Sequence, residues 1–108
     1  MKMESIRGRE VEAQLARALL AAAERAGVTV SPAVSRSRPW ASATFVGTLH
    51  AVTLACTPCC VLGRWLADLP LAELPMRGHI VASLAVDRIV DDGTLVTAEL
   101  SVLTLEDC

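Results

Sequence analysis

The chain has 108 residues, of which 53% are hydrophobic, and its formal net charge is −2. This composition excludes an intrinsically disordered chain, and the acidic balance with only 3% aromatic residues disfavours nucleic-acid binding. No apolar run reaches the roughly 20 residues that a membrane-spanning helix needs. We therefore expect one domain over residues 1–108, with part of its apolar surface facing a partner because a small domain has little interior.

The first ten residues mix three basic side chains with acidic ones, and no apolar signal segment follows them. A cytoplasmic protein of bacterial type with reduced cysteines is therefore expected. Residues 1–40 hold seven basic and four acidic side chains, whereas residues 41–108 hold three basic and eight acidic ones. This asymmetry could steer two copies of the chain together, or it could be ordinary solvated surface.

A helix is predicted from Glu10 to Ala26, because this segment is rich in the strong helix formers Ala, Leu, Glu and Arg. Its apolar face repeats at helical intervals and consists of Val11, Leu15, Ala18, Leu19 and Ala22. Gly27 is expected to end the helix, since glycine readily adopts the left-handed conformation found there.

The alternation from Val28 to Arg36 predicts a half-buried strand, and Pro32 indicates an edge position because proline cannot donate to a ladder. The next residues are expected to form a polar turn that carries Arg36, Arg38 and Trp40. Exposed together, these three side chains could contact an anion or a protein partner. The alternative is a loop whose tryptophan folds back on the core.

The segment from Ala41 to Cys56 is predicted to be the longest strand and a central one. Its large apolar residues change parity near His50. A β-bulge near His50 would explain this change, and Gly47 is a second candidate bulge site. A strand buried on both faces is the alternative.

An amphipathic helix is predicted to follow the cysteines and to run to about Leu69, where Pro70 ends it. Its apolar stripe comprises Val61, Leu62, Trp65, Leu66 and Leu69.

Two final strands, Gly78 to Val90 and Thr94 to Leu105, are joined by a predicted hairpin turn, Asp91-Asp92-Gly93. The residues expected to face the core are Ile80, Ala82, Leu84, Val86, Val96, Ala98, Leu100 and Val102.

The elements give the order α-β-β-α-β-β and an α+β fold, with two helices packed on one face of a four-stranded, mainly antiparallel sheet. The opposite face would present Val81, Ala85, Ile89, Leu95, Leu103 and Leu105. A face so apolar predicts a homodimer through the sheet face or edge. The predicted partner-binding residues are Arg36, Arg38, Trp40, Leu103 and Leu105.

The segment Cys56-Thr57-Pro58-Cys59-Cys60 resembles the Cys-Gly-Pro-Cys motif of thioredoxin-like oxidoreductases, which also lies between a strand and a helix. Thr57 could cap the helix with Pro58 in its first position, so that the helix dipole lowers the pKa of the cysteines in the first turn. The resemblance covers five residues and implies Cys56 and Cys59 as catalytic thiols. Ala55 stands where those enzymes usually have tryptophan.

A zinc site would need Cys56, Cys59 and Cys60 together with His50, His79 or Cys108. Adjacent cysteines on a helix point in different directions, and no second Cys-x-x-Cys is present, so no metal or other cofactor is expected. Both histidines lie on predicted strands, where a hydrogen-bonded or solvent-facing role is expected.

Three functions follow from these patterns. The leading hypothesis is a non-catalytic module that self-assembles or binds a protein partner through an aliphatic sheet face. The second is a thiol-disulfide redox module that uses Cys56 and Cys59. The third is a small apolar-ligand binder, with the ligand between sheet and helices.

Overall fold

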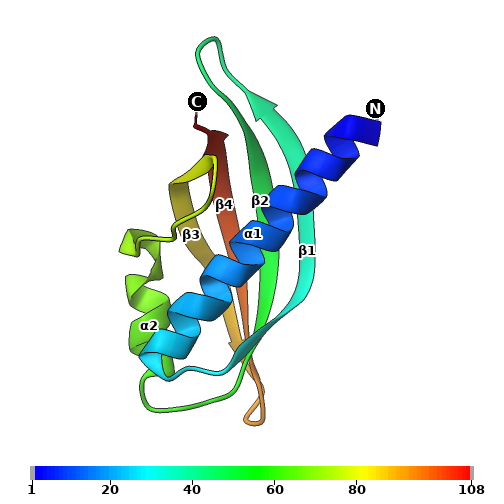
Figure 1. The fold of residues 1–108 in the computed structure, drawn as a ribbon. Helices are drawn as coiled ribbons and strands as arrows, with labels where there is room; N and C mark the ends of the chain where they lie inside the picture. The colour runs from blue at the N-terminus through cyan, green and yellow to red at the C-terminus, as the bar shows by residue number, and fades with distance from the viewer. Residues whose placement is uncertain (1, 108) are drawn as a thin grey trace.

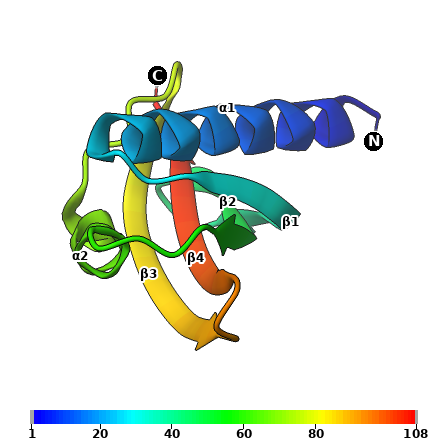
Figure 2. The ribbon, with the colours of Figure 1, turned by 90° about the horizontal axis from the view of Figure 1, so that it is seen from below.

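The computed structural model describes the backbone of residues 2–107 and the side chains of residues 9–107. Its elements are α1 (Lys2–Ala26), β1 (Val30–Ala41), β2 (Val46–Cys56), α2 (Leu62–Asp68), the 3-10 helix η1 (Leu69–Leu71), β3 (His79–Asp91) and β4 (Val96–Glu106). The strands form one sheet in the order β1-β2-β4-β3, and all neighbours are antiparallel. Both helices lie on the same side of the sheet (Figures 1 and 2). The predicted α+β fold is confirmed.

Helix α1 runs diagonally across the sheet and supplies much of the core (Figure 1). It begins at Lys2, earlier than the predicted Glu10, and Gly27 follows it with a φ of 77°. The residues that it buries are Val11, Leu15, Ala18, Leu19 and Ala23, and Ala22 is partly buried. The predicted apolar face is therefore confirmed, and its alanines let the helix approach the sheet closely.

Strands β2 and β4 form the centre of the sheet, as predicted for the segment that ends at Cys56. They pair without any shift in register, so the predicted bulge at His50 or Gly47 is wrong. One parity of β2 faces the helices and is buried, namely His50, Val52, Leu54 and Cys56, and the inward residues Val96, Ala98, Leu100 and Val102 of β4 match it. Leu49 of β2 and Leu103 and Leu105 of β4 have the other parity and face away from the helices.

The register shifts lie in the two edge strands instead. Strand β1 shifts between Pro32 and Val34, and β3 shifts twice, at Ala82 and at Asp87. An edge strand has a partner on one side only, so it can hold an extra residue without breaking a second ladder. The edge position predicted from Pro32 is confirmed.

Strand β1 also continues through the segment that was expected to form a turn, and it ends at Ala41. The reversal comes at residues 42–45, where the amide of Ser42 donates to the carbonyl of Phe45 (2.8 Å) and the Ser42 hydroxyl accepts from the amide of Phe45 (3.0 Å). Pro39 is compatible with the strand because β1 is an edge.

The two bulges change which residues of β3 face the core. Leu84 is buried as predicted, but Ile80 is 48% exposed and Ala82 is exposed. Val81 and Ile89, which were expected on the far face, pair with inward-facing Thr104 and Ala98 and so lie on the helix side. Each bulge adds one residue, and one residue reverses the side to which the following side chains point.

Gly47 is required by the close approach of β4. A Cβ at this position would lie 2.9 Å from Cδ2 of Leu105 and would also collide with the carbonyl oxygen of Thr104. We expect Gly47→Ala to lower the free energy of unfolding by about 1–3 kcal/mol through overpacking. Gly63→Ala is the matched control, because no atom lies within 4 Å of the added group. Urea denaturation should show a loss for the first variant only.

Candidate functional site

The face of the sheet turned away from the helices, here called the outer face, is covered by no other element of the described residues (Figure 2). The strand register brings the five predicted partner-binding residues onto this face in three adjacent rows. Arg36 is level with Ala51 and Ser101, Arg38 with Leu49 and Leu103, and Trp40 with Gly47 and Leu105. Residues from distant parts of the sequence therefore form one continuous surface.

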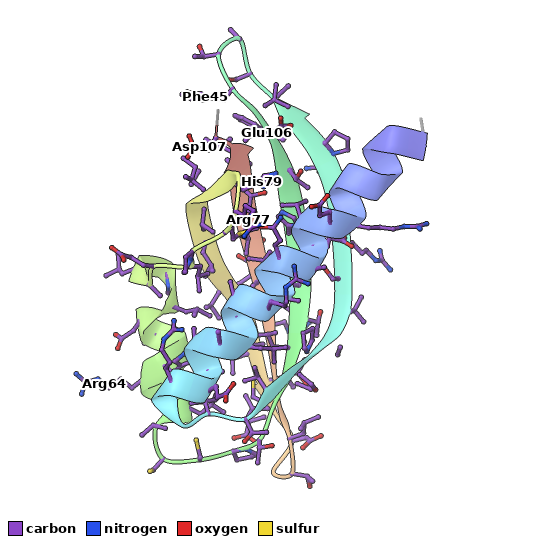
Figure 3. The ribbon with its side chains drawn as sticks, in the orientation of Figure 1. Phe45, Arg64, Arg77, His79, Glu106 and Asp107 are labelled. Atoms are coloured by element: carbon purple, nitrogen blue, oxygen red, sulfur yellow. The ribbon has the colours of Figure 1, made fainter. Side chains whose placement is uncertain are left out.

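The largest apolar side chains gather at one end of the outer face. Leu105 packs over Gly47 and is only 9% exposed although no element covers it. Trp40 and Ile80 flank this pair in the same row, and Leu49 and Leu103 fill the next row. Trp40, Leu49 and Leu103 are half-buried and Ile80 is half-exposed, so their side chains reach solvent. Phe45, also about half exposed, lies at the adjoining β1–β2 turn (Figure 3).

Charges of opposite sign lie toward opposite edges of the outer face. Arg36 and Arg38 are exposed on β1. Toward the opposite edge of the same face, Asp87 of β3 accepts a hydrogen bond from the Ser101 hydroxyl, which places the Asp87 carboxylate on the outer face. Glu99 is also exposed there and pairs with Arg88 at 4.0 Å. The β1 edge is thus basic, while the β3–β4 side carries two carboxylates and one guanidinium.

Sequence reasoning missed Leu49, Ile80 and Asp87 as members of this surface. Leu49 shares its parity with Gly47, and this parity would have indicated the outer face if no bulge had been placed at His50. The positions of Ile80 and Asp87 depend on the bulges of β3, for which the sequence carries no clear signal.

The cysteine segment is arranged differently from the predicted helix start. Helix α2 begins at Leu62 with Val61 as its N-cap, so the placement of Cys59 and Cys60 in its first turn is wrong. The amide of Thr57 donates to the carbonyl of Thr29 (2.9 Å), which keeps this segment beside the start of β1, and no side chain caps α2. Val61 is 41% exposed, whereas Leu62, Trp65, Leu66 and Leu69 are buried as predicted.

The two thiols of the motif lie in opposite environments. Cys56 is fully buried in the core, and Cys59 and Cys60 are exposed. Burial raises the pKa of the Cys56 thiol, which disfavours the thiolate that redox catalysis requires. All three are free, and Cys108 lies outside the described residues. The described part of the chain contains no group of three His, Cys, Asp or Glu side chains placed to hold a metal ion.

His50 lies on the helix side of β2 and is 2% exposed. Its Nε2 lies 2.9 Å from the Thr104 hydroxyl, which itself donates to the Thr48 carbonyl at 3.5 Å. The other ring nitrogen, Nδ1, is buried and has no hydrogen-bond partner among the described residues. Burial lowers the pKa of His50, Glu12 partly opposes this lowering, and His79 adds to it.

One depression in the described surface lies between the end of α1 and α2, with a volume of about 200 Å³. Its walls are Ala26, Val61, Arg64, Trp65 and Asp68. Ligand pockets are usually about 300–1,000 Å³, and this one does not lie between sheet and helices, so it gives the apolar-ligand hypothesis no support. Among the described helices, none is long and apolar enough to cross a membrane.

Comparison of the chain with protein-family models, with curated proteins and with solved structures finds no match.

The buried imidazole predicts a loss of stability in mild acid. Because the pKa of His50 is lower in the folded state than in the unfolded chain, the unfolded state takes up its proton first as the pH falls. We expect the free energy of unfolding to decrease below about pH 6.5, with a slope of at most about 1.4 kcal/mol per pH unit.

Denaturation between about pH 7.5 and pH 5 measures this slope. His50→Gln should reduce the slope, and His79→Gln should retain most of it. Backbone amides of Leu95 and Thr94 lower the pKa of Asp92. The stability that the ionised Asp92 carboxylate contributes is therefore lost only below about pH 4, outside this range. Equal slopes for the native chain and His50→Gln would show that His50 does not cause the loss of stability in mild acid.

Thiol labelling tests the burial of Cys56. In the folded protein at neutral pH, Cys59→Ser and Cys60→Ser should each remove one rapidly reacting thiol, because both side chains are exposed. Cys56→Ala should leave the number unchanged, since a thiol that is buried and un-ionised reacts slowly. Rapid modification of Cys56 would instead support the redox hypothesis.

Proposed function

We propose that this protein is a non-catalytic assembly module that forms a homodimer through the outer face of its sheet. The observation that carries the proposal is the pair of apolar rows formed by Trp40, Leu49, Leu103, Leu105 and Ile80 on a face that no described element covers. Contiguous exposed apolar surface is uncommon on monomers and is typical of interaction sites.

The edges of the sheet are poor surfaces for pairing with another strand. Strand β1 carries Pro32 and Pro39, a register shift after Pro32, and the exposed charges of Arg36 and Arg38. Strand β3 carries two register shifts. Prolines, charges and bulges are the devices by which proteins prevent edge-to-edge association. Of the two dimer interfaces that the sequence left open, the sheet face is therefore favoured over the sheet edge.

A second copy of the chain suits this face because the face is complementary to itself. Its apolar rows supply a surface that would be buried in a dimer, and its basic β1 side can meet the carboxylates of Asp87 and Glu99 in another copy. An unrelated partner would need to provide both features. Assembly of this kind needs no disulfide, which agrees with the proposed reducing cytoplasm.

A single charge introduced into the apolar rows should disrupt the dimer. We expect the native chain to be a dimer at about 10 µM and Leu103→Lys to raise the dissociation constant at least about tenfold, because the ammonium group would be buried twice in a symmetric interface. Leu71→Lys is the matched control, since Leu71 is 91% exposed on η1, away from the outer face.

Sedimentation velocity over a concentration series measures both effects, and circular dichroism verifies the fold of each variant. A native chain that sediments as a monomer at this concentration would disprove the proposal.

A further inference from the structure

The outer face is a grid in which each row is one level of the paired strands, interrupted by the bulges of the edge strands β1 and β3. In the order β1-β2-β4-β3, the five rows are Trp40–Gly47–Leu105–Ile80, Arg38–Leu49–Leu103–Ser83, Arg36–Ala51–Ser101–Ala85, Val34–Thr53–Glu99–Arg88 and Ser31–Ala55–Thr97–Val90. The central strands keep this register without a shift. The grid allows the possible arrangements of two facing copies to be compared row by row.

Two facing sheets related by a twofold axis have two simple arrangements, with the axis along the strands or across them. An axis along the strands places β1 over β3 and β2 over β4 of the partner copy, and each row faces the same row. An axis across the strands places each strand over its own copy in the reverse direction, so that rows at opposite ends of the face meet.

The apolar residues favour the axis along the strands. With this axis, Leu49 faces Leu103 of the partner copy, and Trp40 faces Ile80 of the partner copy. An axis across the middle of the face would place Leu103 against Glu99 of the partner copy, which buries a carboxylate against an apolar side chain. Only the first arrangement brings the apolar ends of the two copies together over the full face.

The charges favour the same arrangement. An axis across the strands through the middle row brings Arg36 against Arg36 of the partner copy. An axis along the strands brings Arg36 over Ala85 of the partner copy, beside the Asp87 carboxylate that the Ser101 hydroxyl holds at this level. Facing sheets cross at about 30°, which moves the outer strands by roughly one residue, and an arginine side chain can span this shift.

The surface area that a stable dimer must bury requires that the whole outer face lie in the interface. Four strands about 4.8 Å apart and ten residues long offer roughly 600 Å² per copy, or about 1,200 Å² in total, which is near the lower limit for stable specific interfaces. Contact through the apolar end alone would bury much less. We therefore infer, on the basis of the proposed function, that the dimer has its twofold axis along the strands and that Arg36 of each copy contacts Asp87 of the partner copy.

Charge reversal tests this arrangement in the full chain. In the homodimers of Arg36→Glu and of Asp87→Arg, like charges meet twice, and we expect each dissociation constant to rise about tenfold. In an equimolar mixture of the two variants, heterodimers should predominate. There, the two reversed charges attract each other across the interface, and the native Arg36 and Asp87 do the same.

Native mass spectrometry counts the homodimers and heterodimers, and sedimentation equilibrium gives the dissociation constants. Arg64→Glu is the control, because Arg64 is also exposed but projects from α2, away from the outer face (Figure 3). The compensation between the two substitutions cannot arise within one copy, since Arg36 and Asp87 lie on opposite edge strands about 14 Å apart.

Each outcome separates the two proposals. A monomeric native chain would disprove the dimer and, with it, the axis. A dimeric native chain whose variants show no weakening, or no preference for the heterodimer, would overturn the axis and leave the proposed assembly intact. Weakening of both homodimers with recovery in the mixture would support the inferred axis.

Discussion

The antiparallel ladder between β2 and β4 is the constraint on which the remaining structure depends. It places Leu54 beside Ala98 and Val52 beside Leu100 under α1, where all four are buried. A slip of one residue would turn these side chains away from the helices and bring polar residues into the core. The hydrophobic pattern of the two strands thus fixes the register, and the register in turn determines which residues form the outer face.

The helices cover one face only, and this one-sided arrangement separates two kinds of surface. Toward the helices, the sheet buries an apolar cluster, and at one end of it lies the hydrogen-bonded pair His50 and Thr104. Away from the helices, the same strands carry leucines, a tryptophan and charges that no described element shields. Both α-helices of the described residues lie on one face of the sheet, so the proposed second copy would supply the layer that the outer face lacks.

Much of this architecture could be predicted from the sequence because its signals are local. The spacing of Val11, Leu15 and Leu19 indicated α1, and Asp92-Gly93 indicated the last hairpin, where Gly93 has a φ of 91°. The candidate surface was also predictable in part, since alternation alone put Leu103 and Leu105 on the side away from the helices.

The errors concern features that depend on tertiary context. The parity change in β2 resembled a bulge, but it reflects two faces that both carry apolar residues: one is buried in the core and the other forms the outer face. The bulges of β3 have no strong sequence signature, so Val81 and Ile89 were placed on the wrong side. Cys56 resembled a catalytic thiol by spacing, yet its position as the last inward residue of a central strand makes it a core hydrophobe.

The protection of the edge strands also bears on how the chain folds. Each hairpin closes over a short loop, whereas the β2–β4 ladder joins Gly47 to Leu105 and Cys56 to Val96, so it has the larger loop-closure cost and forms late. Until then, the open sides of the two hairpins are β2 and β4, which carry neither proline nor a bulge. The nascent chain is therefore most vulnerable to aggregation along the two strands that the native sheet conceals, and docking of the hairpins removes this risk.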